Sequence, residues 1–312
     1  MEIYMAPMEG ITGYIYRKTY SRYFTGVDTY FTPFLAPAKG KPFRHRELAD
    51  ILPEHNAGIR VVPQILTNHA EGFLKAAKVL KDMGYEEVNI NMGCPSATVV
   101  TKGKGAGMLS DTAKLRQFLE DIFAACEMKI SVKTRLGMEF PEEFPDILDV
   151  LEAFPFHEII IHPRTREDYY GNTIHTEMFA LAAERYKTHP ECLCYNGDIT
   201  DMESYARIQK QFPQISKMMI GRGIIGNPFL PEELVAKKNC FDAGRLLAFH
   251  DELFAGYIEA GLGEGNALFK MKELWSYLDR LFPEADQKKA LKKIRKTRDA
   301  DAYQIEVRRL LT

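Results

Sequence analysis

The chain has 312 residues, of which 46% are hydrophobic and 27% charged, and its formal net charge is −2. This composition is that of an ordinary soluble globular protein, and the length suits one large domain or a barrel with a smaller appendix. No run of about 18 apolar residues occurs, which excludes a membrane-spanning helix. The first residues lack the basic and apolar regions of a signal peptide, so we expect a cytoplasmic protein.

The cysteines argue against a disulfide framework and against a structural zinc site. Their number is odd, and no Cys-x-x-Cys pair occurs among Cys94, Cys126, Cys192, Cys194 and Cys240. Cys192 and Cys194 are separated by one residue in a strand-like run, so we expect them to face the same side and to pack as small hydrophobic residues. The sequence predicts no metal site.

Short β-rich runs alternate with longer helical patterns from the N-terminus to about residue 238. One helix is expected to begin at Ser110 or Asp111, and another to end before Gly84. Eight strand–helix units of this size predict a (β/α)₈ TIM barrel, an α/β fold, with a doubly wound open sheet as the alternative. The expected strands are residues 2–6, 29–34, 59–65, 87–91, 129–134, 158–162, 192–196 and 217–221.

Residues 239–312 contain no strand pattern and predict a small all-helical domain after a barrel domain of residues 1–238. One helix should bury the face that carries Leu246, Phe249, Leu253, Phe254 and Tyr257. Residues 288–309 hold nine Lys/Arg against three Asp/Glu, a net charge of +6, which leaves −8 for the rest. A basic end on an acidic chain indicates a polyanionic partner, although a solvated helix face has the same composition.

Two aromatic residues of this helical region allow two interpretations. Trp275 and Tyr277 follow Lys270 and Lys272 closely, a pattern found where aromatic rings stack on nucleic-acid bases. Packing in the helical core is the simpler interpretation, and we expect it for both side chains.

Polar or Gly/Pro-containing residues follow nearly every expected strand. The active site of a TIM barrel forms at the carboxyl ends of its strands, so these residues together predict a ligand-lined mouth. The Asn196-Gly197-Asp198 and Gly221-Arg222-Gly223 turns follow the seventh and eighth strands, where barrels commonly bind phosphate. They are alternatively two tight structural turns.

Lys133 and Cys94 are the strongest chemical candidates. Lys133 lies in an apolar strand, where an ammonium group is costly unless it meets an anion or reaches solvent. Cys94 follows the fourth strand in a Gly-Cys-Pro turn, and the glycine-rich segment 102–107 after it suggests a loop that closes on a substrate. A thiol with a pKa of about 8.5 is mostly protonated at neutral pH and can act as a general acid. A plain buried cysteine is the alternative.

These elements together resemble the FMN-dependent tRNA-dihydrouridine synthase family. The resemblance covers nearly the whole chain, and the Asn-x-Gly-Cys-Pro element is its most specific part. The matching segments are residues 6–10, 89–95, 132–135, 162–166, 196–199 and 219–223.

The resemblance implies an FMN cofactor, NADPH as electron donor, Cys94 as proton donor, and C-terminal helices that bind tRNA in a monomeric protein. Asn91, Arg135 and Arg166 would contact the substrate. The residues implied around FMN are Pro7, Met8, Glu9, Gln64, Lys133, His162, Asn196, Gly197, Asp198, Gly221 and Arg222.

Two positions depart from the family pattern, and several functions stay open. Pro163 stands where the family has Gly, which affects the orientation of the His162 side chain. Asp168 stands where the family has Gln, in a region expected near RNA. The alternatives are action on ribosomal RNA, an FMN barrel that acts on a free pyrimidine, as dihydroorotate dehydrogenases do, and an RNA-binding protein that has lost catalysis. A lyase or aldolase that uses Lys133 as a Schiff base is a further alternative.

Overall fold

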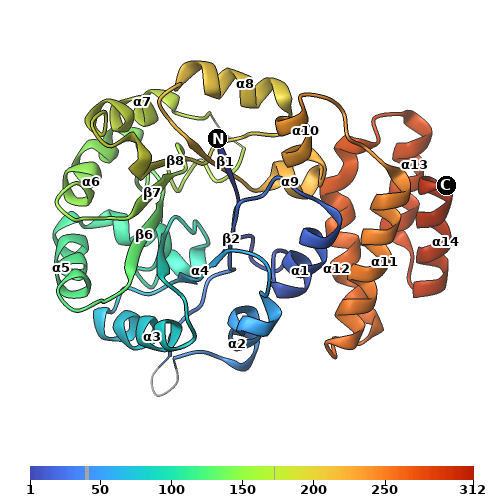
Figure 1. The fold of residues 1–312 in the computed structure, drawn as a ribbon, viewed down its shortest axis with the longest axis horizontal. Helices are drawn as coiled ribbons and strands as arrows, with labels where there is room; N and C mark the ends of the chain where they lie inside the picture. The colour runs from blue at the N-terminus through green and yellow to red at the C-terminus, as the bar shows by residue number, and fades with distance from the viewer. Residues whose placement is uncertain (39–41, 172) are drawn as a thin grey trace.

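A computed structural model describes residues 1–38, 42–171 and 173–312 of the chain (Figure 1). Its central feature is one parallel sheet with the strand order β3-β2-β1-β9-β8-β7-β6-β5-β4. The strands are β1 (Glu2–Met5), β2 (Thr29–Phe31), β3 (Val61–Val62), β4 (Gln64–Ile65), β5 (Glu87–Met92), β6 (Lys129–Thr134), β7 (Glu158–Ile161), β8 (Leu193–Tyr195) and β9 (Lys217–Ile220).

Pro63 interrupts the third expected strand and divides it into β3 and β4. Proline has no N–H to donate to the strand ladder, so regular pairing stops there. β3 pairs with β2 and β4 pairs with β5, and the carbonyl of Pro63 still accepts the N–H of Asn89 at 2.9 Å. The broken strand therefore joins the two ends of the sheet. The predicted barrel is confirmed, and the open doubly wound sheet is wrong.

Helices cover the outside of the barrel (Figure 1). They are α1 (Tyr14–Tyr23), α2 (His45–Ile51), α3 (Ala70–Asp82), α4 (Ala97–Val100), α5 (Thr112–Phe123), α6 (Phe144–Leu151), α7 (Thr176–Arg185), α8 (Met202–Gln211), α9 (Arg222–Gly226) and α10 (Leu230–Ala236). The expected helix ends are confirmed. Asp111 is the N-cap of α5 and accepts the N–H of Lys114 at 3.1 Å, and Gly84, with φ of 92°, follows α3.

The eighth expected strand region needs one correction. β8 begins at Leu193, so Cys192 lies outside it in the short 3₁₀ turn Pro190–Cys192. Only Cys194 is buried inside the sheet, and Cys192 does not share its face as we expected. Pro190 at the start of the turn fixes a non-extended backbone and delays the strand.

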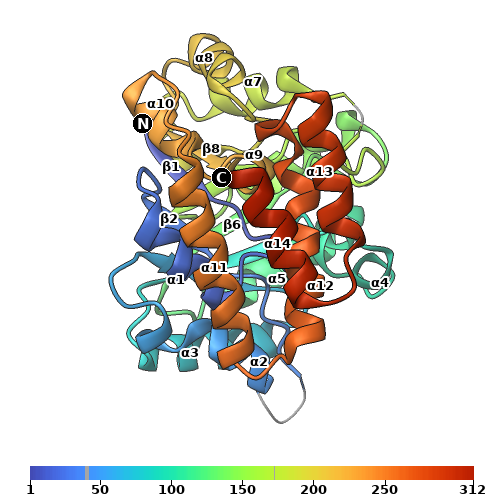
Figure 2. The same cartoon turned by 90° about the vertical axis from the view of Figure 1, so that its right-hand side faces the viewer.

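Four helices follow the barrel and stand together on one side of it (Figures 1 and 2). They are α11 (Ala243–Glu259), α12 (Glu264–Tyr277), α13 (Ala285–Lys296) and α14 (Ala300–Leu311). α11 packs on α1, and α12 packs on α9. Trp275 is fully buried and donates to the Tyr303 hydroxyl at 2.8 Å, which confirms its expected place in the core. The predicted apolar face of α11 is also buried. In the described part of the chain, every helix is too short or too polar to cross a bilayer.

The base of the barrel holds a buried ion pair. Lys217 at the start of β9 lies 2.8 Å from the carboxylate of Glu158 at the start of β7, and Glu158 is only 3% exposed. Tyr4 donates a further hydrogen bond to Glu158 at 3.2 Å. Burial raises the pKa of Glu158 to about 7 in spite of the lysine. The pair is therefore held against a large desolvation cost.

Replacing Lys217 with Met should destabilise the fold by about 3–5 kcal/mol, because it leaves a buried carboxylate without a counter-charge. The loss should grow as the pH rises above about 7, because the wild-type Glu158 then ionises beside Lys217, whereas the variant must keep the proton on Glu158 or bury an unpaired charge. Denaturant unfolding at pH 5 and pH 8 measures both effects. The matched control is the Lys217→Met/Glu158→Gln double variant, which should recover most of the loss at pH 8. Equal stability of the single and double variants there would contradict this account.

Candidate active site at the carboxyl end of the barrel

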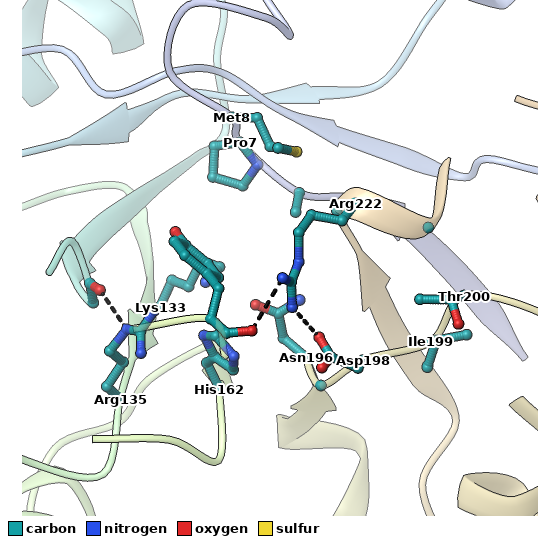
Figure 3. A pocket seen from close by; sticks show the side chains of 16 residues that line it. Pro7, Met8, Lys133, Arg135, His162, Asn196, Asp198, Ile199, Thr200 and Arg222 are labelled. Atoms are coloured by element: carbon teal, nitrogen blue, oxygen red, sulfur yellow. Dashed lines mark hydrogen bonds and ion pairs between the residues drawn. The ribbon is translucent and has the colours of Figure 1, made fainter. Parts of the chain in front are cut away.

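Two adjoining cavities open at the carboxyl ends of the strands. We call the one over β7–β9 the inner cavity, and the one over β4–β6 the outer cavity. The residues that line both are Pro7, Met8, Gly93, Lys133, Tyr170 and Arg222. Of the predicted site residues, the inner cavity adds Arg135, His162, Asn196, Gly197, Asp198 and Gly221 (Figure 3), and the outer cavity adds Glu9, Gln64, Asn91 and Cys94.

Arg166 is the one predicted site residue that lines neither cavity. Its guanidinium pairs with Glu167 and stacks over the Tyr169 ring, 5.4 Å from the ring centroid. Although the loop after β7 stays at the mouth, the Arg166 side chain contacts Glu167 and Tyr169 of that loop and enters neither cavity.

A chain of buried amides forms the floor beneath the outer cavity. Gln64 donates to Asn89 at 2.8 Å and accepts from Asn91 at 2.7 Å, and Asn89 donates to Ser131 at 2.9 Å. These residues occupy paired positions on three neighbouring strands, and Asn91 is likewise paired in register with Lys133. Because alternate residues of a strand share a face, this register points all of them into the barrel.

Asn91 also fixes the turn that carries Cys94. Its side-chain oxygen accepts the N–H of Gly93 at 3.1 Å and the N–H of Cys94 at 2.9 Å. The thiol is half-buried, and burial raises its pKa above the ordinary value of a cysteine. Cys94 is therefore a protonated thiol at neutral pH, held at the edge of the outer cavity.

The glycine-rich segment after Cys94 is not the closing loop that we expected. Gly105–Ser110 forms a 3₁₀ helix whose first five residues are buried, and Ala106 N–H donates to the Cys94 carbonyl at 3.1 Å. At Gly105, with φ of 57°, a Cβ atom would lie 2.8 Å from that carbonyl oxygen. The glycine allows the segment to pack directly against the Cys94 turn and to support it.

Positive charge is concentrated around the inner cavity (Figure 3). Lys133 is half-buried and forms no ion pair with any described residue; burial, aided by Arg135, lowers its pKa to about 7. Burial also lowers the pKa of His162 well below its ordinary value, and Arg135 and Lys133 add to the effect, so the imidazole is neutral at pH 7. A buried lysine among other cations calls for an anionic ligand.

Asp198 holds two of these cations in place. Its carboxylate lies 2.8 Å from Arg164 and also pairs with Arg222. Burial raises the pKa of Asp198, but the two guanidinium groups outweigh it, and the net pKa lies below the ordinary value. Arg164 is 3% exposed and was not among the predicted site residues, although it lies in the 162–166 segment that carries the resemblance.

Backbone turns close the other side of the inner cavity. At Gly223, a Cβ atom would lie 2.0 Å from the carbonyl oxygen of Ile199, and at Gly197 it would lie 2.1 Å from the Tyr195 hydroxyl. A side chain at Gly223 would push apart the turns after β8 and β9, and one at Gly197 would displace the Tyr195 ring. The glycines therefore bring the turns together into a cradle in which backbone groups can approach an anion closely.

Tyr170 separates the two cavities and was not predicted. Its ring centroid lies 5.2 Å from the Arg135 guanidinium and 5.0 Å from that of Arg222, and its carbonyl accepts a hydrogen bond from Arg222 at 3.1 Å. The ring also lies 6.1 Å from His162. It is a large aromatic side chain placed where a flat ligand would pass between the cavities.

The departures at Pro163 and Asp168 shape the same loop. Pro163 accepts the N–H of His175 at 2.8 Å, and Asp168 accepts the N–H and hydroxyl of Thr165 at 2.8 and 2.9 Å. The Asp168 side chain is only 14% exposed and also pairs with His175 at 3.2 Å. Asp168 therefore folds the loop back on itself.

Helix α12 completes the outer cavity from the C-terminal side. Glu273 and Tyr277 line the cavity, and Lys270, one turn earlier, donates to the Gly10 carbonyl at 2.5 Å. Tyr277 is partly buried against the core, as we expected, and it also lines this cavity, which we did not predict. Its spacing from Lys270 and Glu273, at i, i+3 and i+7, is the signal of a shared helix face that could have identified it.

Comparison with known proteins identifies the family. The model of the family "Dihydrouridine synthase (Dus)" matches residues 4–308. The chain belongs to the dihydrouridine synthase family. A probable tRNA-dihydrouridine synthase of Staphylococcus aureus is 30% identical over 259 residues, which cover 81% of this chain and 77% of that protein. One of Rhodobacter capsulatus is 29% identical over 235 residues, covering 75% and 71%.

Solved structures support the fold alone. Morphinone reductase has a TM-score of 0.53 at 12% identity, and a variant of NCR from Zymomonas mobilis has a TM-score of 0.52 at 16% identity. Each match covers 76% of this chain and 86% of the other. This member of the dihydrouridine synthase family thus shares its barrel with reductases of distant sequence.

The basic side chains packed around Lys133 should affect its pKa, and this can be tested directly. Lys133 should titrate near pH 7, whereas an unperturbed lysine side chain titrates near about 10.4. Replacing Arg135 with Gln should raise the Lys133 pKa, because it removes the nearest like charge while burial persists. NMR of ¹³C-dimethylated lysines measures both values. A Lys133 signal that titrates with the surface lysines would contradict the buried, cation-rich site.

Proposed function

We propose that this member of the dihydrouridine synthase family reduces the C5=C6 bond of a uridine in structured RNA, with FMN as cofactor and NADPH as electron donor. The observation that carries the proposal is Lys133, a cation without a counter-charge that lines both cavities and lies between the glycine cradle and Cys94. The names of the curated relatives favour tRNA over ribosomal RNA as the substrate.

The site residues fit FMN. The inner cavity offers a glycine cradle and the Arg222 guanidinium to the ribityl phosphate, and Asp198 would act by orienting Arg222 rather than by touching the phosphate. Lys133 and the amide of Gln64 face the space in which the ring system would lie, along Pro7 and Met8. When bound, FMN supplies a hydride for carbon C6 of the uracil ring.

Lys133 would stabilise negative charge on the reduced ring system. Among the described residues no carboxylate pairs with the Lys133 amino group, so the charge that it carries is available to the ligand. A bound anion would raise the Lys133 pKa again and keep the side chain protonated at neutral pH. Neutral His162 and Asn91 could then orient the uracil by hydrogen bonds without adding charge.

Cys94 would deliver the proton to C5 from the face opposite the cofactor. The proposal requires a thiol that keeps its proton until the reaction, and burial favours the protonated form by raising the Cys94 pKa. Asn91 acts as a positioning residue, because its oxygen holds the Cys94 and Gly93 amides. Proton donation by a positioned acid contributes about 10²–10⁴-fold to a rate.

The C-terminal helices would bind the RNA backbone, so residues 239–312 would act as an RNA-binding domain beside a catalytic barrel of residues 1–238. The basic residues on α13 and just after it are exposed and form no ion pair with a described residue: Lys288, Lys289, Lys292, Lys293, Lys296 and Arg298. Such a surface attracts phosphates and makes binding salt-dependent. The uridine would have to leave its stack to enter the mouth, which is easiest in a loop.

Replacing Cys94 with Ala should lower dihydrouridine formation by about 10²–10⁴-fold and leave flavin reduction by NADPH intact, because only the proton donor is lost. Single-turnover assays on RNA and stopped-flow flavin absorbance measure the two half-reactions. The matched control is Cys126→Ala, a half-buried cysteine outside both cavities. Wild-type RNA turnover by the Cys94 variant would remove the thiol from the mechanism.

Reversing Lys292, Lys293 and Lys296 to Glu should weaken RNA binding and reduce its dependence on salt, because about three phosphate contacts are lost. Binding isotherms between 50 and 200 mM salt test this. The charge-matched control reverses Lys75, Lys78 and Lys81 on α3, away from the C-terminal helices. Equal affinities of the two triple variants would place the RNA elsewhere.

A further inference from the structure

A third cavity lies at the junction of the barrel and the C-terminal helices, and we call it the junction cavity. Its lining comes from α1, α2, the end of α11 and α12, and α2 lies beside the ends of the two C-terminal helices (Figure 2). Its volume is about 700 Å³, within the range of small-molecule sites. Ile11 and Pro33 line both this cavity and the outer cavity, so the two cavities adjoin each other.

The walls of the junction cavity suit a flat heteroaromatic ring. Most of the lining side chains are apolar, including Leu48, Leu52 and Leu262. Tyr14 and His55 stack on each other with ring centroids 4.1 Å apart and planes 11° apart, and they form an aromatic part of the wall. A purine can bury its faces on such a surface without leaving polar protein groups unpaired.

The rim of the junction cavity is cationic. Arg46 of α2 and Lys270 of α12 line it and supply the charge, with Arg46 the more exposed of the two and Lys270 bonded to the Gly10 carbonyl. The Arg46 side chain is 71% exposed, and the Glu9 carboxylate, 3.5 Å from it, is also half exposed. Such an exposed ion pair is weak, so a phosphate group of a ligand can replace Glu9 as the partner of Arg46.

The buried carboxylate in the wall does not cancel this charge. Asp50 accepts the N–H of Tyr14 at 2.6 Å and lies 3.5 Å from the fully buried guanidinium of Arg17. Its charge is therefore directed into the protein. The rim keeps its attraction for a phosphate group that carries close to two negative charges.

We propose that the junction cavity binds the adenylate end of NADPH, with adenine between the apolar walls and the 2′-phosphate at Arg46. This inference rests on the proposed function, in which NADPH is the electron donor. The nicotinamide end of the same molecule would reach the outer cavity past Ile11 and Pro33. Arginine binds phosphate through a planar fork of N–H donors. Arg46 would therefore be the residue that discriminates NADPH, which carries the 2′-phosphate, from NADH, which lacks it.

An RNA nucleotide is the less favoured occupant. A phosphodiester carries one charge and runs along a surface, whereas a terminal phosphate carries up to about two and can sit at the rim of a closed cavity. The exposed basic surface on α13, moreover, is made of residues that do not line this cavity.

Calorimetric binding of adenosine 2′,5′-bisphosphate and of 5′-AMP to the flavin-loaded protein tests the proposal. The bisphosphate should bind more tightly than AMP, and Arg46→Ala should weaken the bisphosphate by about tenfold or more while leaving AMP unchanged, because a charge-assisted phosphate contact is lost. The matched control is Arg207→Ala, an exposed arginine on α8 that does not line the cavity. Equal affinity of wild type and Arg46→Ala for the bisphosphate would overturn the assignment.

A second variant tests the cavity itself. Ala260 is exposed at the rim, so Ala260→Trp can fill the cavity without disturbing the core. It should weaken both adenylates and slow flavin reduction by low NADPH concentrations, with reduction by dithionite unchanged. If Ala260→Trp weakens RNA binding but neither adenylate, the occupant is RNA and the proposal fails. Failure of the proposed function is a separate result, since it would appear as a wild-type protein that forms no dihydrouridine.

Discussion

Uncompensated positive charge at the carboxyl end of the barrel is the constraint on which the site depends. Lys133, Arg135 and Arg222 line the inner cavity together with the neutral His162, and Asp198 is the carboxylate among its described lining residues. Asp198 is already engaged by Arg164 and Arg222, so it fixes two guanidinium groups and leaves Lys133 without a partner. A fold keeps such a cluster at a cost to its own stability, and a bound anion offsets that cost.

The barrel places these charges with little freedom. Asn91 and Lys133 are register partners on β5 and β6, and Gln64 and Asn89 are partners on β4 and β5. The amide chain that joins them is buried and paired, which makes it stiff. The same Asn91 that belongs to this floor also holds the Cys94 turn, so Cys94 and Lys133 share one rigid support.

The sequence was sufficient to predict the strands and the barrel mouth where the local pattern of side chains agrees with the tertiary structure. Apolar runs gave the strands, and fourteen of the fifteen predicted site residues line the two cavities at the mouth, because parallel strands bring their carboxyl ends together. The expected strand 59–65 ran through Pro63, and only the pairing of β3 with β2 and of β4 with β5 shows that the break leaves the barrel closed. The position of the Arg166 side chain depends on the local fold of its loop, where it pairs with Glu167, and the motif alone does not describe this.

Residues supplied by distant segments could not be placed from the sequence. Tyr170 enters the mouth because its loop is folded by the bonds of Asp168 to Thr165 and His175, and no periodicity describes such a loop. Glu273 and Tyr277 reach the outer cavity only because α12 packs beside the barrel, an arrangement set by buried side chains such as Trp275.

The packing of α12 ties the C-terminal helices to the chemistry of the barrel. Lys270 donates to the Gly10 carbonyl, in the same loop that carries Pro7 and Met8 into both cavities. Glu273 and Tyr277, on the same helix face, close the outer cavity. A shift of the helices would therefore change the shape of the mouth as well as any surface they offer to RNA. For this reason a ligand held between α2 and α12 is able to bias the site without touching the reacting atoms, provided that it binds one position of α12 better than another.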